Sequence, residues 1–273
     1  MPLAHHMTMR LVEHHWIARE SRELRLVANL IYRIGNHAGL LAFCLSDTHL
    51  HCLAEGSRAE AGELARRLEI ALSRALKLAS RFERARVRPV NGLDHLENAV
   101  FYLFRQSLHH RTRFDPLMEG CSLLDLLGLR RIGAEPTTER LLNALPRLTL
   151  EQLRPLLRID RSLEPTPADL IEAACAVIAE PHLRSKTART HEARQALAHL
   201  LRDRMGTANL ARALGLSRLA RPSRASEAPR DKSPDARLLA AITQFARLRA
   251  SRAQEHARLL DQAAEAGPSG AFA

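Results

Sequence analysis

Two histidines alternate with apolar residues early in this chain of 273 residues, in the order His49-Leu50-His51-Cys52. Successive side chains of a β-strand point to opposite faces of a sheet. The pattern therefore predicts a strand over 49–54, with Leu50 and Cys52 facing a core and both histidines projecting from the other face. Two imidazoles on one face can bind a single metal ion, although ordinary histidines at a sheet surface follow the same pattern.

The segments around this strand predict an α+β fold, with an antiparallel sheet and packed helices. Apolar spacing at i, i+3, i+4 and i+7 predicts a helix that starts at an N-cap Ser21 and stops at Gly35 or Gly39. A longer helix, rich in arginine, is expected after the histidine strand. The expected strands cover 3–12, 40–45 and 49–54; the later helices cover about 59–84 and 95–109, with a connection over 86–92 between them.

Tyr102 and Gln106 are four residues apart in the last of these helices. Side chains at i and i+4 share a helix face, so a phenol and an amide oxygen can be presented together. With the two imidazoles, these groups would suit attack by a tyrosine on a metal-polarised phosphodiester. Taken alone, Tyr102 is better explained as a tyrosine of a core or an interface with its hydroxyl near water.

The chain is strongly basic, with 41 Lys and Arg against 30 Asp and Glu and a net charge of +11. Such a surplus favours nucleic acid or an anionic membrane surface as a partner, the alternative being a basic surface with no polyanion partner. Aromatic residues make up only 4% of the chain, so base stacking cannot be the main mode of binding. The helix over 59–84 is expected to contact DNA phosphates, unless its basic face is simply solvated. The residues expected to make these contacts are Arg66, Arg67, Arg74, Lys77 and Arg81.

The four cysteines lie in apolar stretches and show no C-x-x-C spacing, which favours buried, reduced thiols in a cytoplasmic protein. No apolar run approaches the roughly 20 residues of a membrane span, and the N-terminus lacks the apolar core of a signal peptide. We therefore expect a cytoplasmic protein that does not enter the membrane.

Beyond Phe114 the pattern is helical throughout. We expect four segments, 1–130, 131–221, a linker over 222–234, and a basic helix with a frayed tail over 235–273. Residues 206–217 resemble the first helix and turn of a helix-turn-helix, but Pro222 would truncate the second helix, so a plain helical bundle is the alternative. Helix starts are expected from capping signals at Ser122, Thr149, Thr166 and Thr190.

The order of these parts resembles the single-tyrosine HUH transposases, most closely the REP-associated tyrosine transposases, over roughly residues 1–130. The family begins with a strand that holds a His and an Arg, a place filled here by residues 4–10, which end at Arg10. Its His-hydrophobic-His motif matches 49–51, and its tyrosine helix matches Tyr102. In many members a polar metal ligand follows the tyrosine by one turn, where this chain has Gln106.

Two loop motifs differ from the family pattern. Asp47-Thr48 stands where Pro-Asn often precedes the first histidine, and residues 107–110, Ser-Leu-His-His, stand where an Asn-Pro pair often follows the tyrosine helix. These residues shape loops, so the expected fold is unaffected. A domesticated, inactive descendant and a divergent active branch would both show such changes.

The resemblance implies an HUH nuclease-like fold of the ferredoxin-like or RRM-like kind. It also implies Mg²⁺ or Mn²⁺ held by His49, His51 and Gln106, DNA contact by Arg10, and attack by Tyr102 that leaves a 5′-phosphotyrosine and a free 3′-hydroxyl. The substrate would be single-stranded DNA beside a hairpin, bound by a monomer or homodimer associated with the nucleoid. The alternatives are a DNA-binding protein of the same fold that no longer cuts, and a metal-free basic protein that binds structured RNA.

Overall fold

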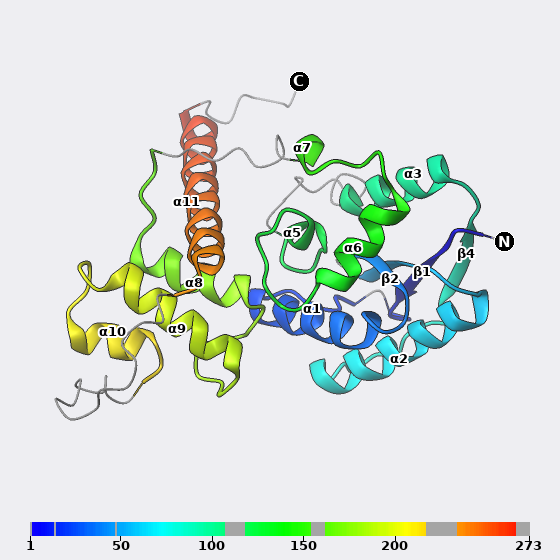
Figure 1. The fold of residues 1–273 in the computed structure, drawn as a ribbon, viewed down its shortest axis with the longest axis horizontal. Coiled ribbons are helices and arrows are strands. Elements are labelled where there is room, and N and C mark those ends of the chain that lie inside the picture. The colour runs from blue at the N-terminus through cyan, green and yellow to red at the C-terminus, as the bar shows by residue number, and fades with distance from the viewer. Residues whose placement is uncertain are drawn as a thin grey trace, which may run out of the picture.

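The computed structural model describes residues 2–13, 15–46, 48–106, 118–153, 162–216 and 234–265. The sheet lies toward one end of the molecule with α1, α2 and α3, and helices α8–α11 lie toward the other (Figure 1). The helices are α1 (Ser21–Gly35), α2 (Arg58–Leu76), α3 (Leu93–Phe104), α5 (Leu123–Leu126), α6 (Glu135–Ala144), α7 (Leu150–Leu153), α8 (Pro167–Val177), α9 (Ala188–Leu201), α10 (Thr207–Ala213) and α11 (Ala236–Glu265). Four features discussed above lie outside the described residues: the linker up to residue 233, the second helix of the expected helix-turn-helix, the loop over 107–110 and the tail from 266.

The sheet has four antiparallel strands in the order β2-β3-β1-β4, which confirms the predicted α+β class. The strands are β1 (Ala4–Arg10), β2 (Leu40–Ser46), β3 (His49–Ala54) and β4 (Arg86–Val90). Helices α1 and α2 cover one face, where Met7, Leu50 and Cys52 are fully buried. The prediction that Leu50 and Cys52 face a core is confirmed.

The opposite face of the sheet is covered at one end by α3, α5 and α6, through a second core that includes Leu41, Leu53, Val100 and Leu103. This core continues beyond residue 130, as far as Leu153. The histidines of β3 lie on the remaining part of this face, which borders the pocket described below. A third core joins α8, α9 and α11.

The expected helix over 59–84 is shorter than predicted, because α2 ends at Leu76. Lys77 follows in the left-handed conformation with φ 52°, and its N–H bonds to the carbonyl of Ser73. The apolar residues after Lys77 were expected to continue the apolar face of the helix. Phe82 instead forms an antiparallel β-bridge with Leu11, next to strand β1. Arg81 and Arg84 are therefore not helical residues.

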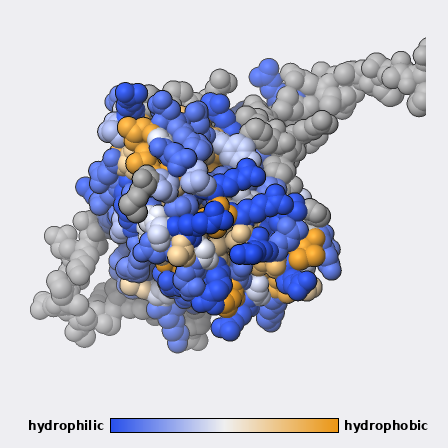
Figure 2. Space-filling model, turned by 90° about the vertical axis from the view of Figure 1, so that its right-hand side faces the viewer, coloured by the Kyte–Doolittle hydropathy of each residue, from blue (hydrophilic) through white to orange (hydrophobic). Residues whose placement is uncertain are grey.

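The expected connection over 86–92 is also wrong, since its first five residues form edge strand β4. Arg86 and Arg88 alternate with Val87, which packs against the first core. Pro89 is compatible with this strand because proline is tolerated at a sheet edge. Figure 2 looks onto the side of the molecule that carries β4 and α2, and hydrophilic side chains cover most of it.

Helix capping differs from prediction at three of the expected positions. The N-cap of α1 is Glu20 rather than Ser21, and the N-cap of α9 is Thr187, whose side chain accepts from the N–H of Thr190. Ser122 precedes α5 without a side-chain capping bond. The N-cap predicted at Thr166, with Pro167 as the first helical residue, is confirmed, and Asp169 completes a capping box with it.

The outer edge of β2 is covered by residues 120–122. The N–H of Leu45 donates to the carbonyl of Gly120, and the N–H of Ser122 donates to the carbonyl of Phe43, both at 2.9 Å. All four cysteines are buried free thiols, as predicted. None of the helices in the described ranges has the length and apolar character of a membrane span.

A buried ion pair fastens the segment after these residues to α1. The guanidinium of Arg130 donates to the carboxylate of Asp125 at 2.9 Å, and both side chains are almost fully buried. The same carboxylate accepts from the hydroxyl of Tyr32, and burial raises the pKa of that tyrosine well above its usual value. Tyr32 is therefore a buried packing residue.

Candidate tyrosine and histidine site

A pocket of ≈ 460 Å³ lies on the histidine-bearing face of the sheet, between strands β1, β3 and β4 and helix α3. Its residues come from segments that are far apart in the sequence. They are His6, Thr8, Arg10, Thr48, His49, His51, Glu83, Arg84, Arg86, Arg88 and Tyr102. We call this the tyrosine pocket.

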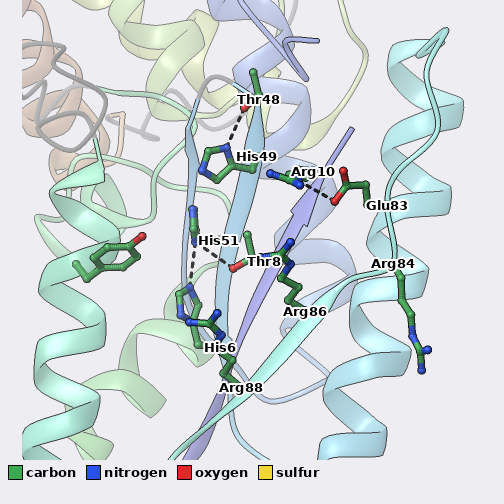
Figure 3. Close-up of a pocket in the computed structure, with 11 residues that line it drawn as sticks. His6, Thr8, Arg10, Thr48, His49, His51, Glu83, Arg84, Arg86 and Arg88 are labelled. Carbon is green, nitrogen blue, oxygen red and sulfur yellow. Dashed lines mark hydrogen bonds and ion pairs between the residues drawn. The ribbon is translucent and has the colours of Figure 1, made fainter. Parts of the chain in front are cut away.

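Three histidines lie in a row along the floor of the tyrosine pocket (Figure 3). The rings of His49 and His51 have centroids 4.8 Å apart, as expected for neighbours on one face of a strand. His6 joins them from β1, with its Nε2 3.0 Å from Nδ1 of His51. The antiparallel pairing of β1 with β3 places Thr8 opposite His51 and therefore brings His6 within reach.

His6 is neutral under physiological conditions, because burial, followed by the charge of Arg88 and the neighbouring His95, lowers its pKa to about 4. A hydrogen bond between two neutral imidazoles needs one N–H and one lone pair. When Nδ1 of His51 donates to His6, Nε2 of His51 keeps its lone pair and can bind a metal ion. His6 is thus placed to select the tautomer of His51, a role that the spacing along the sequence did not reveal.

Tyr102 lies beside this row and remains 40% exposed. Its ring meets that of His51 edge-on at a centroid distance of 5.8 Å, and that of His6 at 5.9 Å. Helix α3 buries the next residue, Leu103, in the core and so turns Tyr102 toward the pocket. The structure therefore brings Tyr102 together with His49 and His51.

Gln106 does not line the tyrosine pocket. Its side chain is almost fully buried, and its Nε2 donates to the backbone carbonyl of Tyr102 at 3.2 Å. Its Oε1 is also buried and accepts no hydrogen bond from the described residues. Gln106 therefore lies one turn from the tyrosine, as expected, but it is buried and does not line the tyrosine pocket.

Four arginines give the tyrosine pocket a positive charge, and only Arg10 among them was predicted from the sequence. Arg10 is held by Glu83 at 2.7 Å. Arg84, Arg86 and Arg88 were missed; the alternation of Arg86 and Arg88 with Val87 was the signal of a half-buried strand. The other arginines and the lysine expected to contact DNA lie outside the pocket: Arg66, Arg67, Arg74, Lys77 and Arg81.

The fit of a metal ion can be judged from the donor set. Within the described ranges, no group of three or more His, Cys, Asp or Glu side chains is arranged to hold an ion. His49 and His51 provide two imidazoles in this pocket, beside arginines that attract phosphate. This set suits a weakly held Mg²⁺ or Mn²⁺ completed by water and phosphate oxygens, and it does not suit a closed protein cage.

Comparison of the chain with known proteins gave no match to a protein-family model, to a curated protein or to a solved structure.

Proposed function

We propose that the protein nicks single-stranded DNA and transfers the cut strand through a covalent bond to Tyr102. The observation that carries this proposal is the position of Tyr102: its ring is half-exposed and lies against His51 in a pocket lined by four arginines. A tyrosine kept only for packing would be expected to bury its ring, as Tyr32 does. The choice of single-stranded DNA beside a hairpin follows the resemblance to HUH transposases.

In this reaction the phenol oxygen of Tyr102 attacks the phosphorus and the bond from phosphorus to O3′ breaks. The phenol loses its proton and the departing O3′ gains one, which leaves a 5′-phosphotyrosine and a free 3′-hydroxyl. Arg86 and Arg88 hold the phosphate by charge-assisted hydrogen bonds and offset its negative charge. A Mg²⁺ or Mn²⁺ ion bound by His49 and His51 would polarise the scissile phosphate. The phosphotyrosine keeps the energy of the broken bond, so rejoining to another 3′-hydroxyl needs no nucleotide cofactor.

The second candidate is a DNA-binding protein of the same fold that does not cut. The position of Gln106 favours it, because the residue expected as the third metal ligand is buried and does not line the pocket. Two imidazoles alone hold a hard cation weakly. On this reading the histidines, Tyr102 and the arginines form a surface that binds a DNA strand.

The test is denaturing electrophoresis of labelled, hairpin-flanked single strands after incubation with the protein and Mn²⁺. The parent protein should give a shifted protein–DNA band that disappears with a chelator. Tyr102→Phe should bind the strand nearly as well as the parent but form no band, and His49→Ala should bind with little band. Tyr32→Phe is the matched control, because it removes a phenol outside the pocket and should leave the band in place.

Tight binding without a covalent band, over a range of hairpin substrates, would favour the non-cutting protein. A band that persists in Tyr102→Phe would contradict the role of Tyr102 directly.

A further inference from the structure

A second cavity, of ≈ 810 Å³, lies where α2 passes the edge strand β4. Val87, which faces it, points away from the sheet face that carries Arg86 and Arg88, so the cavity lies on the other side of β4 from the tyrosine pocket. Arg84 lines both cavities. We call the second cavity the α2 groove; its lining is Arg58, Ala59, Gly62, Arg66, Glu69, Arg84, Ala85 and Val87.

The α2 groove carries three guanidinium groups and is therefore suited to a phosphate. Arg66 is engaged on the exposed side of α2 by Glu63, at 2.7 Å. Arg58 lies at the first turn of α2, and Arg84 lies at the junction with the tyrosine pocket. A DNA strand that leaves the tyrosine pocket past Arg84 meets Arg58 next within the groove, so its phosphates can be followed by positive charge around the sheet edge.

The floor of the α2 groove is small and apolar. A Cβ atom built on Gly62 would meet nothing within 4 Å, so the groove is open over this point of the helix. Ala59, Ala85 and Val87 lie around it. Glycine inside a helix costs about 1 kcal/mol relative to alanine, and its missing side chain leaves space over the helix here.

Glu69 is the unusual group in the α2 groove. Its Oε1 is buried, and none of the described residues donates a hydrogen bond to it. Arg58, Arg66 and Arg84 are the charged groups that share the groove, and no ion pair joins any of them to Glu69 in the described part of the chain. Desolvation accordingly raises the pKa of Glu69 to about 7. Buried acceptors nearly always have a donor, so this one points to a donor on a ligand.

We propose that the α2 groove binds one unpaired nucleotide of the DNA strand that occupies the tyrosine pocket. Arg58 and Arg84 contact its phosphates, its base lies over Gly62, and Glu69 accepts a hydrogen bond from the exocyclic amino group of cytosine or adenine. The continuity of the strand rests on the proposed function, whereas the recognition of the base does not. Thymine presents no exocyclic amino group, so the groove should discriminate against it.

The test measures the binding of labelled homopolymers by fluorescence anisotropy at pH 8, using full-length protein that carries Tyr102→Phe. Homopolymers present the same base at every register, so the position of the strand need not be known. Oligo(dC) and oligo(dA) should bind about tenfold more tightly than oligo(dT) of equal length, the value of one hydrogen bond to a charged acceptor. Glu69→Gln should bring this ratio close to one, because an amide can donate to the O4 of thymine as well as accept.

Two further variants separate the groove from the general charge of the protein. Gly62→Leu fills the groove without changing charge, and the helical position favours leucine, so the variant should fold at least as well and yet lose the discrimination. Arg58→Ala should weaken the binding of every homopolymer. Arg67→Ala is the control for base discrimination: Arg67 is exposed on the same helix and lines neither cavity, so its loss should leave the ratio of oligo(dC) to oligo(dT) binding unchanged.

Equal binding of oligo(dC) and oligo(dT) by the parent, or a ratio that Glu69→Gln and Gly62→Leu leave unchanged, overturns the proposal. The covalent-band assay remains the separate test of Tyr102. If the protein discriminates between bases but forms no covalent band, the α2 groove belongs to a protein that binds DNA and does not cut. If the band forms without base discrimination, the proposed role of the α2 groove is rejected and the chemistry of Tyr102 is retained.

Discussion

Glu69 also provides a prediction about stability that needs no DNA. Its pKa rises from the ordinary 4.5 to about 7 because burial disfavours the charged form. The folded protein therefore binds a proton more tightly than the unfolded chain does. Where the folded state holds more protons, stability falls as the pH rises, so the loss should occur between about pH 4.5 and pH 7.

The size of this loss follows from the pKa change. One pKa unit corresponds to about 1.4 kcal/mol, so the full change would cost roughly 3 kcal/mol in a dry site. Glu69 is only half-buried, and screening by water reduces the expected cost to about 1–2 kcal/mol. Glu69→Gln removes the charge and keeps the shape, so the variant should be more stable than the parent by this amount at pH 8 and equal to it at pH 4.

The measurement is urea denaturation of both proteins at the two pH values, with the free energy of unfolding compared in pairs. Other carboxyl groups titrate alike in both proteins and cancel from the difference. Glu63→Gln is the control on the same helix; Glu63 is exposed and paired with Arg66, so its loss should give no gain at pH 8. A gain from Glu69→Gln that is the same at both pH values would refute the reasoning, because it would not come from ionisation.

Two further predictions concern the buried ion pair and the edge arginines. Asp125→Ala should destabilise the protein by about 3–5 kcal/mol in the same denaturation assay, because it leaves its guanidinium partner buried without a counter-charge; a loss below ~1 kcal/mol would contradict this. In the double variant Arg86→Ala/Arg88→Ala, the slope of log binding constant for single-stranded DNA against log salt concentration should become less negative by about 1.4. Each phosphate contact contributes about 0.7 to this slope. The same pair of changes at Arg67 and Arg74, which line neither cavity, should alter that slope much less, and equal effects would remove the special role of β4.

Local patterns predicted the elements whose signals lie within a few residues. The alternation around Leu50 and Cys52 predicted β3 and its buried face. The arginine-rich helix expected after β3 is α2, which begins directly after Ser57. The end of α2 was missed because Lys77 adopts the left-handed conformation without a glycine to signal it. β4 was missed because Pro89 argues against a strand wherever the strand is not known to be at an edge.

The candidate site shows the same limit. The side-by-side arrangement of His49 and His51 is a property of one strand and was predictable from their spacing. The contact of His6 with His51 spans 45 positions of sequence and depends on the register between β1 and β3. The burial of Gln106 depends on how α3 packs against the sheet, which no i+4 rule specifies. The arginines on β4 became part of the site only through the pairing of that strand with β1.

The two edges of the sheet are protected from adding another chain in different ways. Residues 120–122 occupy hydrogen-bonding groups along β2 and so cover that edge permanently. The β4 edge instead relies on Arg86, Arg88 and Pro89, and charge protects only while it is not neutralised. A bound polyanion would leave Pro89 as the main barrier to strand addition there. We therefore expect self-association through β4, if it occurs, to depend on DNA and to weaken with salt, which analytical ultracentrifugation with and without oligonucleotide would reveal.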